Sequence, residues 1–255
     1  MSWNHIQVAA DGPRTTIGLA RPERRNALSL ELMTEVTKAL REVPDSARAV
    51  VIAAEGPAFS AGHDLSEMID RPRGFYDDLF AVCTDMMETI HSIPQPVIAR
   101  VHGVATAAGC QLVASCDLAV ASTDAWFGTP GVKIGLFCTT PAVPLVRAIG
   151  RKRAMEMLLT ARIVDAETAL QWGLVNRVVP AEDLDAAVTD YVDTIAGFSG
   201  HVIGLGKAAF YRQAGLSLRD AYAVTQPVMA DNAALPDAQE GMSAFLEKRP
   251  AEWPD

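Results

Sequence analysis

The stretch that decides the fold is Phe59-Ser60-Ala61-Gly62-His63-Asp64-Leu65, which follows the apolar segment Ala49-Val50-Val51-Ile52-Ala53-Ala54. The apolar segment predicts a buried strand, and the stretch after it is typical of a loop that feeds a helix. Asp64 is a good N-cap, and Glu67 three residues later completes a capping-box pattern. We therefore expect outward-facing N–H groups around Gly62, His63 and Asp64, able to hold an anion or a carbonyl oxygen that is becoming one.

A second junction of the same kind follows, at His102-Gly103-Val104-Ala105-Thr106-Ala107-Ala108-Gly109-Cys110-Gln111-Leu112. It comes directly after another apolar strand, Pro96-Val97-Ile98-Ala99-Arg100-Val101. Its small residues allow the backbone to approach a ligand closely. The two junctions could supply one N–H each to a single carbonyl oxygen. The alternative is that both are ordinary turns in an α/β domain.

The composition favours a compact globular protein of one large domain or two small ones, with 255 residues, 49% hydrophobic and 21% charged. A net charge of −9 argues against nucleic-acid binding. No segment is long and apolar enough to span a bilayer, so no membrane association is expected.

Four cysteines and five histidines show no metal-ligand spacing, so no metal site is predicted. The cysteines are expected to be reduced and mostly buried. Met1-Ser2-Trp3-Asn4-His5 lacks the charged-then-apolar pattern of a secretory signal, and a cytoplasmic protein is the expectation.

The first half of the chain alternates short strands and helices, beginning with a hairpin of residues 6–9 and 15–20. Ser29 is expected to cap a helix running to about residue 43. Further expected elements are strands at 96–101 and 118–121 and helices at about 75–90, 106–115, 141–149, 151–159, 165–172, 181–198 and 201–213. Strands become scarce after about residue 140.

Together these segments resemble the crotonase (enoyl-CoA hydratase/isomerase) superfamily. Both junctions carry the resemblance, and four further blocks follow the family's order, from about residue 5 to the C-terminus: Arg21-Pro22-Glu23-Arg24-Arg25-Asn26-Ala27-Leu28, Ser115-Cys116-Asp117-Leu118-Ala119, Gly173-Leu174-Val175-Asn176-Arg177-Val178-Val179-Pro180 and Glu240-Gly241-Met242-Ser243-Ala244-Phe245-Leu246-Glu247-Lys248-Arg249-Pro250. The resemblance implies an α/β crotonase (ClpP-like) spiral of ββα units over residues 1–195, and a helical trimerisation region over 196–255. It also implies an acyl-CoA thioester substrate, a role in fatty acid metabolism, no cofactor beyond the substrate's own coenzyme A, and homotrimers or dimers of trimers.

The resemblance assigns the two carbonyl-polarising amides to the His63 and Ala108 N–H groups. Hydratases of the superfamily carry two glutamates, at positions held here by Gln111 and, within Phe127-Gly128-Thr129-Pro130-Gly131, by Gly131. A Gln side chain can orient water, but it cannot accept and return a proton near neutral pH. The chain therefore resembles a glutamate-lacking, hydratase-domain-containing branch. Cys138 is expected to face the acyl chain, most simply as a buried thiol.

Coenzyme A contacts follow from the same resemblance. The nucleotide is expected near Arg24, Arg25 and Ala27, because a guanidinium offers forked donors to phosphate. Alternatively, the arginines form a solvated basic cluster. The backbone of Ala61, His63, Asp64 and Leu65 is expected beside the adenine and pantetheine. Phe245 and Lys248 are expected to approach the nucleotide of the same or a neighbouring subunit.

Three functions remain open from the sequence. The first is a nominal enoyl-CoA hydratase/isomerase, which stabilises a thioester enolate but hydrates crotonyl-CoA poorly or not at all. The second is a decarboxylase of the methylmalonyl-CoA type, since loss of CO₂ generates the enolate without a base; Cys138 stands where those enzymes place a tyrosine. The third is a non-catalytic fatty acyl-CoA binder. A dinucleotide-binding enzyme lacks support, because no Gly-x-Gly-x-x-Gly follows the first strand.

Overall fold

Two sheets form the framework of the chain, which the computed structural model describes over residues 3–253. The larger sheet has six strands in the order β1-β2-β3-β5-β7-β10, and the smaller has four in the order β4-β6-β8-β9. All pairings are parallel except β1 with β2 and β8 with β9. The strands are β1 (Ile6–Asp11), β2 (Arg14–Leu19), β3 (Ala49–Ala54), β4 (Ala58–Ser60), β5 (Val97–Val101), β6 (Val104–Thr106), β7 (Leu118–Ser122), β8 (Trp126–Gly128), β9 (Ile163–Asp165) and β10 (Arg177–Val179).

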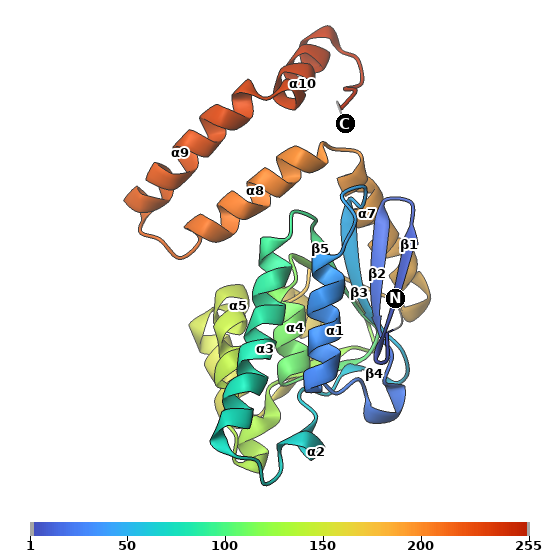
Figure 1. Ribbon diagram of the computed structural model, residues 1–255, viewed down its shortest axis with the longest axis vertical. Helices are drawn as coiled ribbons and strands as arrows, with labels where there is room; N and C mark the ends of the chain where they lie inside the picture. The colour runs from blue at the N-terminus through green and yellow to red at the C-terminus, as the bar shows by residue number, and fades with distance from the viewer. Residues whose placement is uncertain (1–2, 254–255) are drawn as a thin grey trace.

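The chain passes between the sheets in a repeated step. A longer strand of the large sheet, β3, β5 or β7, is followed within a few residues by a short strand of the small sheet, β4, β6 or β8. A helix after β4 and after β6 then returns the chain to the large sheet (Figure 1). This is the predicted spiral of ββα units.

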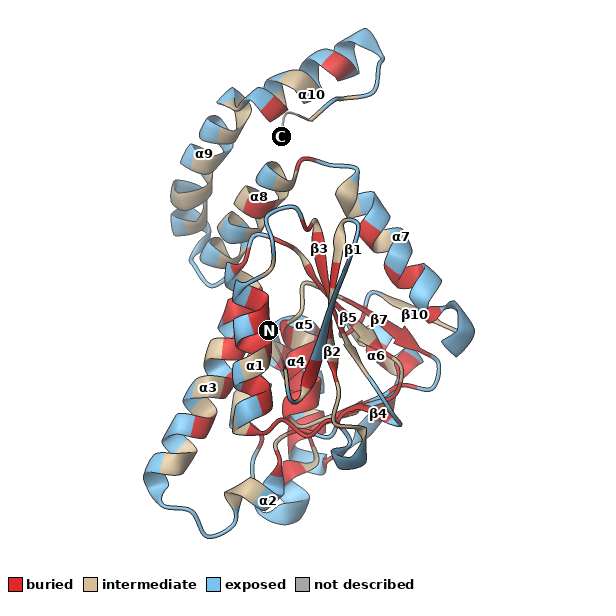
Figure 2. Cartoon of the chain, turned by 45° about the vertical axis from the view of Figure 1, so that its right-hand side comes forward, coloured by how far each residue is buried: buried red, intermediate tan, exposed pale blue. Residues whose placement is uncertain are grey.

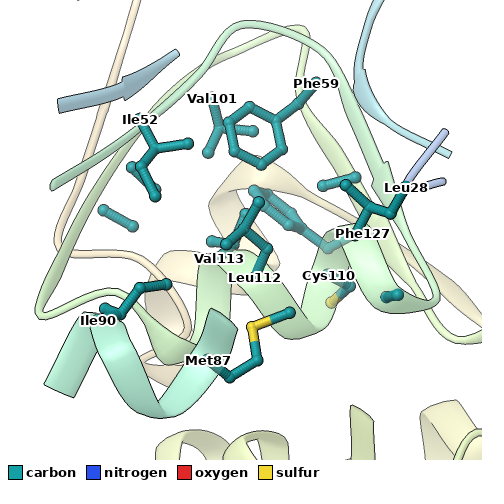
Figure 3. Close-up of a cluster of buried hydrophobic side chains, with 14 of the residues drawn as sticks. Leu28, Ile52, Phe59, Met87, Ile90, Val101, Cys110, Leu112, Val113 and Phe127 are labelled. Atoms are coloured by element: carbon teal, nitrogen blue, oxygen red, sulfur yellow. The ribbon is translucent and has the colours of Figure 1, made fainter. Parts of the chain in front are cut away.

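Helices cover one face of the large sheet and enclose the main core (Figure 2). The body helices are α1 (Leu30–Arg41), α2 (Leu65–Met68), α3 (Arg73–Ser92), α4 (Ala108–Ser115), α5 (Thr139–Thr160), α6 (Ala166–Trp172) and α7 (Leu184–Ala196), with 3₁₀ turns η1 (Pro22–Arg24), η2 (Pro130–Ile134) and η3 (Ala181–Asp183). Figure 3 shows the core between the sheets and helices, where Phe59 and Phe127 are both fully buried. These two rings lie on β4 and β8, so the small sheet is fixed by packing as well as by its short ladders. A second cluster lies between α7 and the opposite face of the large sheet.

The last three helices, α8 (Gly200–Gln213), α9 (Leu218–Ala234) and α10 (Pro236–Glu247), form a C-terminal arm that extends from the body (Figure 1). A buried polar cluster fastens α8. The Lys207 ammonium lies 2.7 Å from the Asp117 carboxylate and donates to the carbonyls of Ile90 and Gln95. The Tyr211 hydroxyl donates to the other oxygen of Asp117. A buried ion pair with its remaining hydrogen bonds satisfied holds one geometry, and removing either partner is costly.

Most predicted elements are present, and the differences have local causes. The helices expected at 141–149 and 151–159 are both present within α5, where the non-helical backbone of Gly150 (φ 76°, ψ 163°) separates them as predicted. The Ser29 hydroxyl caps α1 as expected, by accepting from the Leu32 N–H. The three-residue strands β4, β6, β8, β9 and β10 were not predicted, because so short a segment shows no alternation.

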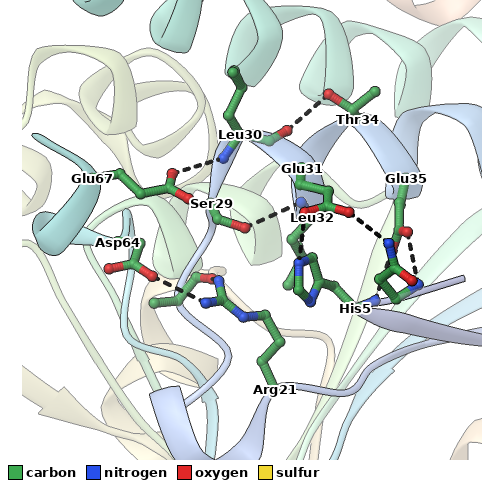
Figure 4. A network of polar contacts seen from close by, with 12 residues as sticks. His5, Arg21, Ser29, Leu30, Glu31, Leu32, Thr34, Glu35, Asp64 and Glu67 are labelled. Carbon is green, nitrogen blue, oxygen red and sulfur yellow. Dashed lines mark hydrogen bonds and ion pairs between the residues drawn. The ribbon is translucent and has the colours of Figure 1, made fainter.

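The predicted capping box at α2 is wrong in its second half. The Asp64 carboxylate does accept from the Ser66 N–H, but Glu67 Oε2 accepts from the backbone N–H of Leu30, 3.1 Å away (Figure 4). Glu67 therefore joins α2 to the start of α1 instead of closing its own helix. The box cannot close because the Asp64 N–H that Glu67 would accept already donates to the Leu28 carbonyl.

Candidate functional site

A cavity of about 500 Å³ opens beside both junctions. Its walls come from the first junction with α2 and α3, from the start of α4, and from the segment joining η2 to α5. The lining residues are Ala61, His63, Leu65, Met68, Phe80, Ala107, Ala108, Pro130, Gly131, Lys133, Ile134, Leu136, Phe137, Cys138, Thr139, Thr140 and Pro141. The structure thus brings together the predicted residues Ala61, His63, Leu65, Ala108 and Cys138.

The first junction leaves the His63 amide free at the cavity wall. The Leu28 N–H donates to the Gly62 carbonyl at 2.7 Å, and the Asp64 N–H donates to the Leu28 carbonyl at 3.2 Å. This bridge fixes the backbone on both sides of His63. Within residues 3–253, the His63 N–H itself donates to no protein acceptor. It is a held donor without a partner, the property required to bind a carbonyl oxygen.

The second junction leaves an equivalent amide at the N-terminus of α4. The Ala107 N–H donates to the Gly128 carbonyl at 2.8 Å, and the Gln111 N–H returns to the Ala107 carbonyl. The Ala108 N–H between them has no protein partner in the described chain. Ala107 has φ 50° and ψ −118°, a backbone conformation that a residue with a Cβ rarely adopts. This bend turns the chain into α4 with the Ala108 amide at the cavity.

Close backbone packing holds the two junctions together. A Cβ added at Gly62 would lie 3.2 Å from the Ala108 nitrogen and 2.8 Å from the Ala107 Cβ. A Cβ added at Gly109 would lie 2.3 Å from the Ser60 carbonyl oxygen. Since neither glycine tolerates a side chain at these separations, each is required for the approach of one junction to the other. The pair of amides therefore belongs to one site.

The His63 imidazole lies edge-on to Phe80, with ring centroids 5.4 Å apart. Both ring nitrogens are buried, and neither has a hydrogen-bond partner in the described chain. Burial lowers the pKa of His63, so the ring is neutral near pH 7. The side chain can accept or donate one hydrogen bond to a ligand, but no carboxylate orients it for proton transfer.

Gln111 lies one turn after Ala108 on α4 and is only 4% exposed. Helical side chains tilt toward the N-terminus of their helix, so the Gln111 amide points back toward Ala108. Its Oε1 atom has no partner, and the same is true of the Oγ1 atom of buried Thr129, next to Pro130 at the cavity wall. Gln111 does not itself line the cavity. It lies behind the first turn of α4.

The position of the second expected glutamate is closed by neighbouring atoms. A Cβ built on Gly131 would lie 2.5 Å from the Leu136 carbonyl oxygen and 2.7 Å from the Cys138 sulfur. The segment folds back here because the Leu136 N–H donates to the Gly131 carbonyl at 3.0 Å. Cys138 is buried at the N-cap of α5, and this burial raises the pKa of its thiol. The thiol is protonated near pH 7, and no carboxylate can occupy this wall without moving the segment.

The predicted nucleotide-binding arginines lie on an exposed loop beside the first junction. Arg24 and Arg25 are exposed and make no ion pair within the described residues. The Arg25 carbonyl accepts from the Ala61 N–H at 3.0 Å, which joins the loop to the junction. Buried Asn26, at φ 51°, holds the loop by donating to the carbonyls of Glu55 and Ala58. The sequence offered a signal for Asn26, since Asn favours left-handed turns, but its anchoring role was not predicted.

Internal hydrogen bonds occupy the backbone of two of the predicted coenzyme A contacts. Ala27 is buried, its N–H donates to the Arg24 carbonyl, and its own carbonyl accepts from Ser29 and Arg21. The backbone of Asp64 is also hydrogen-bonded within the protein, while its carboxylate pairs with Arg21 at 3.2 Å (Figure 4). Ala27 and Asp64 therefore shape the loop, and their place beside coenzyme A stays a prediction. Arg21 is likewise not part of a solvated cluster.

Phe245 and Lys248 do not reach the cavity of their own chain. They lie in and just after α10, at the end of the molecule opposite to α2 (Figure 1). Phe245 is 82% exposed. The C-terminal arm directs α10 away from the body, and an approach of these residues to the nucleotide of the same or a neighbouring subunit stays a prediction.

Comparison with known proteins identifies the class. The family model Enoyl-CoA hydratase/isomerase matches residues 15–255. Mouse "Enoyl-CoA hydratase domain-containing protein 3, mitochondrial" is 47% identical over 246 residues, which are 95% of this chain and 82% of that protein. The crystal structure of the human protein of that name has a TM-score of 0.95 at 43% identity, covering 98% of this chain and 100% of its own. An enoyl-CoA hydratase structure from Mycobacterium smegmatis has a TM-score of 0.96 at 49% identity, covering 98% of this chain and 99% of its own.

The chain therefore belongs to the enoyl-CoA hydratase/isomerase (crotonase) family, and the predictions of family, fold and enzyme class are confirmed. Its function is accordingly related to acyl-CoA. Proteins of this family with hydratase names include the "Probable enoyl-CoA hydratase" of Mycobacterium tuberculosis, 36% identical over 254 residues, 98% of this chain and 97% of that protein.

The expectation of a cytoplasmic protein is contradicted, because the mouse, rat and human relatives are named as mitochondrial. Charge and core pattern carry no information on the compartment, so this expectation had no physical basis in the folded domain. Among the helices of residues 3–253, none combines the length and the apolarity needed to cross a bilayer.

Proposed function

We propose that the protein binds an acyl-CoA thioester in this cavity and polarises its carbonyl between the His63 and Ala108 N–H groups. The observation that carries the proposal is the pair of unpartnered amides, held by packed junctions at one wall of one cavity. Two preorganised donors aimed at a developing enolate oxygen lower a barrier by roughly 3 kcal/mol each. Any reaction that passes through a thioester enolate gains from them.

Hydration of an enoyl thioester is expected to be slow. It requires groups that deliver water and move a proton, and the two positions expected to do so hold Gln111 and Gly131. The ionisable side chains of the cavity wall are His63, Lys133 and Cys138, and none of them is a carboxylate. The test follows the loss of the enoyl absorbance with crotonyl-CoA. Turnover at about 10 s⁻¹ or more, the rate of an ordinary enzyme, would reject slow hydration.

The same geometry supports a second candidate, decarboxylation of a malonyl-type thioester. Loss of CO₂ leaves an electron pair that forms the enolate directly, so this step needs the amide pair and no base. Release of CO₂ from malonyl- and methylmalonyl-CoA measures it. Binding of acyl-CoA without turnover of either substrate type would instead favour a non-catalytic fatty acyl-CoA binder.

The same proposal extends to assembly. The C-terminal arm exposes large apolar side chains, including Leu218 at 77%, Phe245 at 82% and Leu246 at 79%. Burial of such side chains between copies is favourable, and we expect trimers or dimers of trimers through this arm. Light scattering of the purified chain gives the mass. A monomer at micromolar concentration would contradict this part of the proposal.

A further inference from the structure

Beyond the two amides, the cavity wall described within residues 3–253 is mainly apolar, and its polar side chains are those of His63, Lys133, Cys138, Thr139 and Thr140. Leu65, Met68 and Phe80 form one side, from α2 and α3. Ile134 and Phe137 form another, from the segment between η2 and α5. No Asp or Glu belongs to the lining, and its cation is Lys133. Burial keeps the His63 ring neutral, so the interior offers a ligand little beyond apolar contact.

Several of these side chains remain open to water. Ile134 is 58% exposed, Phe137 is 43% exposed and Leu65 is 46% exposed, while the residues beside them enclose the cavity. Binding of an apolar ligand that covers such side chains is favourable, because it removes apolar surface from water. A ligand that extends along the wall would cover Leu65, Ile134 and Phe137 together. A ligand that contacts only the two amides would leave them exposed.

The size of the cavity points the same way. A methylene occupies about the volume of a water molecule, roughly 30 Å³, so a four-carbon acyl group fills on the order of 120 Å³. The cavity measures about 500 Å³. Even with part of it taken by the pantetheine arm, a four-carbon group leaves much of the apolar wall uncovered.

We propose that the site selects thioesters of aliphatic acyl chains longer than four carbons and discriminates against acyl groups that end in a carboxylate. The inference rests on the proposed function, because the amides fix where the acyl chain begins. A terminal carboxylate on a chain lying between Phe80 and Phe137 loses its water and meets no buried cation. The closed position at Gly131 supports the selection, since the Leu136 carbonyl and Cys138 thiol fill it and add no charge.

The test is the equilibrium affinity of the full-length protein for coenzyme A and saturated acetyl-, butyryl-, octanoyl- and dodecanoyl-CoA, measured by calorimetry. Each methylene buried contributes about 0.8 kcal/mol, which is a three- to fourfold change in Kd. Octanoyl-CoA has four more methylenes than butyryl-CoA, so we expect it to bind roughly 10-fold more tightly if two of them are buried and up to about 250-fold if all four are. Affinities within threefold across the series would reject the inference while leaving acyl-CoA binding intact. Absence of binding to every thioester would reject the proposed function itself, and the inference with it.

Two variants test whether the apolar wall at Ile134 causes the preference for long acyl chains. Ile134→Asp should weaken octanoyl-CoA by at least about tenfold and leave acetyl-CoA within about twofold, since only a long chain reaches residue 134. Ile69→Asp is the matched control, because Ile69 is 69% exposed, adjoins Met68 and does not line the cavity. An equal effect of both variants would overturn the assignment of the wall.

The carboxylate part is tested by glutaryl-CoA against pentanoyl-CoA, which has the same number of acyl carbons. We expect glutaryl-CoA to bind at least about tenfold more weakly. Lys133 is exposed at the cavity edge, so its ammonium is the group that could instead bind a terminal carboxylate. Tighter binding of glutaryl-CoA that is lost in Lys133→Ala would show that the site recognises a carboxylate, and would overturn the selection proposed here.

Discussion

The two walls of the cavity differ in what they offer a thioester. The wall formed by the two junctions holds a pair of donors that no protein acceptor satisfies, and close glycine packing fixes their positions. The opposite wall holds Gly131, a position that has no room for a side chain, while the other expected acid–base position, Gln111, is an uncharged amide behind the first turn of α4. Stabilisation of a charge on oxygen and movement of a proton are separable parts of a catalytic site. Here the geometry retains the first and lacks the second.

The largest expected effect is that of Gly109→Ala, which disrupts the packing of the two junctions that hold the His63 and Ala108 N–H groups. The added Cβ would lie 2.3 Å from the Ser60 carbonyl, a backbone atom that cannot turn away. We expect a loss of about 3 kcal/mol in unfolding free energy and loss of acyl-CoA binding, measured by urea denaturation and calorimetry. Gly74→Ala in α3 is the control, because nothing lies within 4 Å of its Cβ, and it should change stability by at most about 1 kcal/mol. Similar losses in both variants would contradict the packing of the junctions.

The closed wall is tested by Gly131→Glu. The Leu136 carbonyl obstructs the new Cβ, so the segment must move, at an expected loss of about 2 kcal/mol in unfolding free energy. Hydration of crotonyl-CoA should not increase, because the carboxylate has no place at this wall. Gly131→Ala separates the obstruction from the charge and should destabilise by a similar amount. A stable Gly131→Glu variant with faster hydration would refute the closure.

Gln111→Glu sharpens the comparison, since this side chain has space where Gly131 has none. The two side chains have nearly the same shape, and burial raises the pKa of a carboxyl toward the range useful for a general acid. We expect hydration of crotonyl-CoA to rise about tenfold above the wild type, measured by enoyl absorbance. Gln111→Met keeps the volume without the acid and should give no rise. An equal rise in both would assign the effect to packing.

The smallest effect concerns the imidazole of His63. Burial lowers its pKa from 6.5, so below about pH 6.5 the unfolded chain binds more protons than the folded one. Stability should therefore fall as the pH drops below this value, with a slope of at most about 1.4 kcal/mol per pH unit. His63→Gln should lose less stability than the wild type between pH 7.5 and pH 5.5, in paired denaturation curves.

The same variant should bind acetyl-CoA within about twofold of the wild type, because its backbone N–H remains. A collapse in affinity would show that the ring, and not the amide, holds the thioester.

The junctions themselves could be predicted from the sequence because their signals are local. An apolar strand, small residues and a capping Asp64 follow one another in a few positions, and α4 continues as a buried apolar helix. The family resemblance then supplied which amides face each other. The same resemblance identifies Gln111 and Gly131 as the positions of the two glutamates, so slow hydration could be predicted from the sequence.

What the sequence could not provide depends on contacts between distant segments. The obstruction at Gly131 requires residues 136–138 to fold back, and nothing in Leu136-Phe137-Cys138 indicates that turn. Glu67 matched a capping box, yet its partner is the distant Leu30 N–H, because the Asp64 N–H already donates to the Leu28 carbonyl. Ala27 matched a ligand-binding motif, and its backbone is bonded to the neighbouring residues of its own loop. The sequence pattern alone specifies neither the distant partner of Glu67 nor the loop bonds of Ala27.

Asp117 connects α4 to α8. It stands two residues beyond the last residue of α4, Ser115, and its carboxylate takes the Lys207 ammonium and the Tyr211 hydroxyl from α8. The N-terminus of α4 carries the Ala108 amide at the cavity, and its C-terminus lies beside Asp117. The eight residues of this helix therefore connect the cavity to the ion pair with α8. We expect a displacement of α8 to act on the C-terminal end of α4, and through this helix on the position of the Ala108 N–H at the cavity.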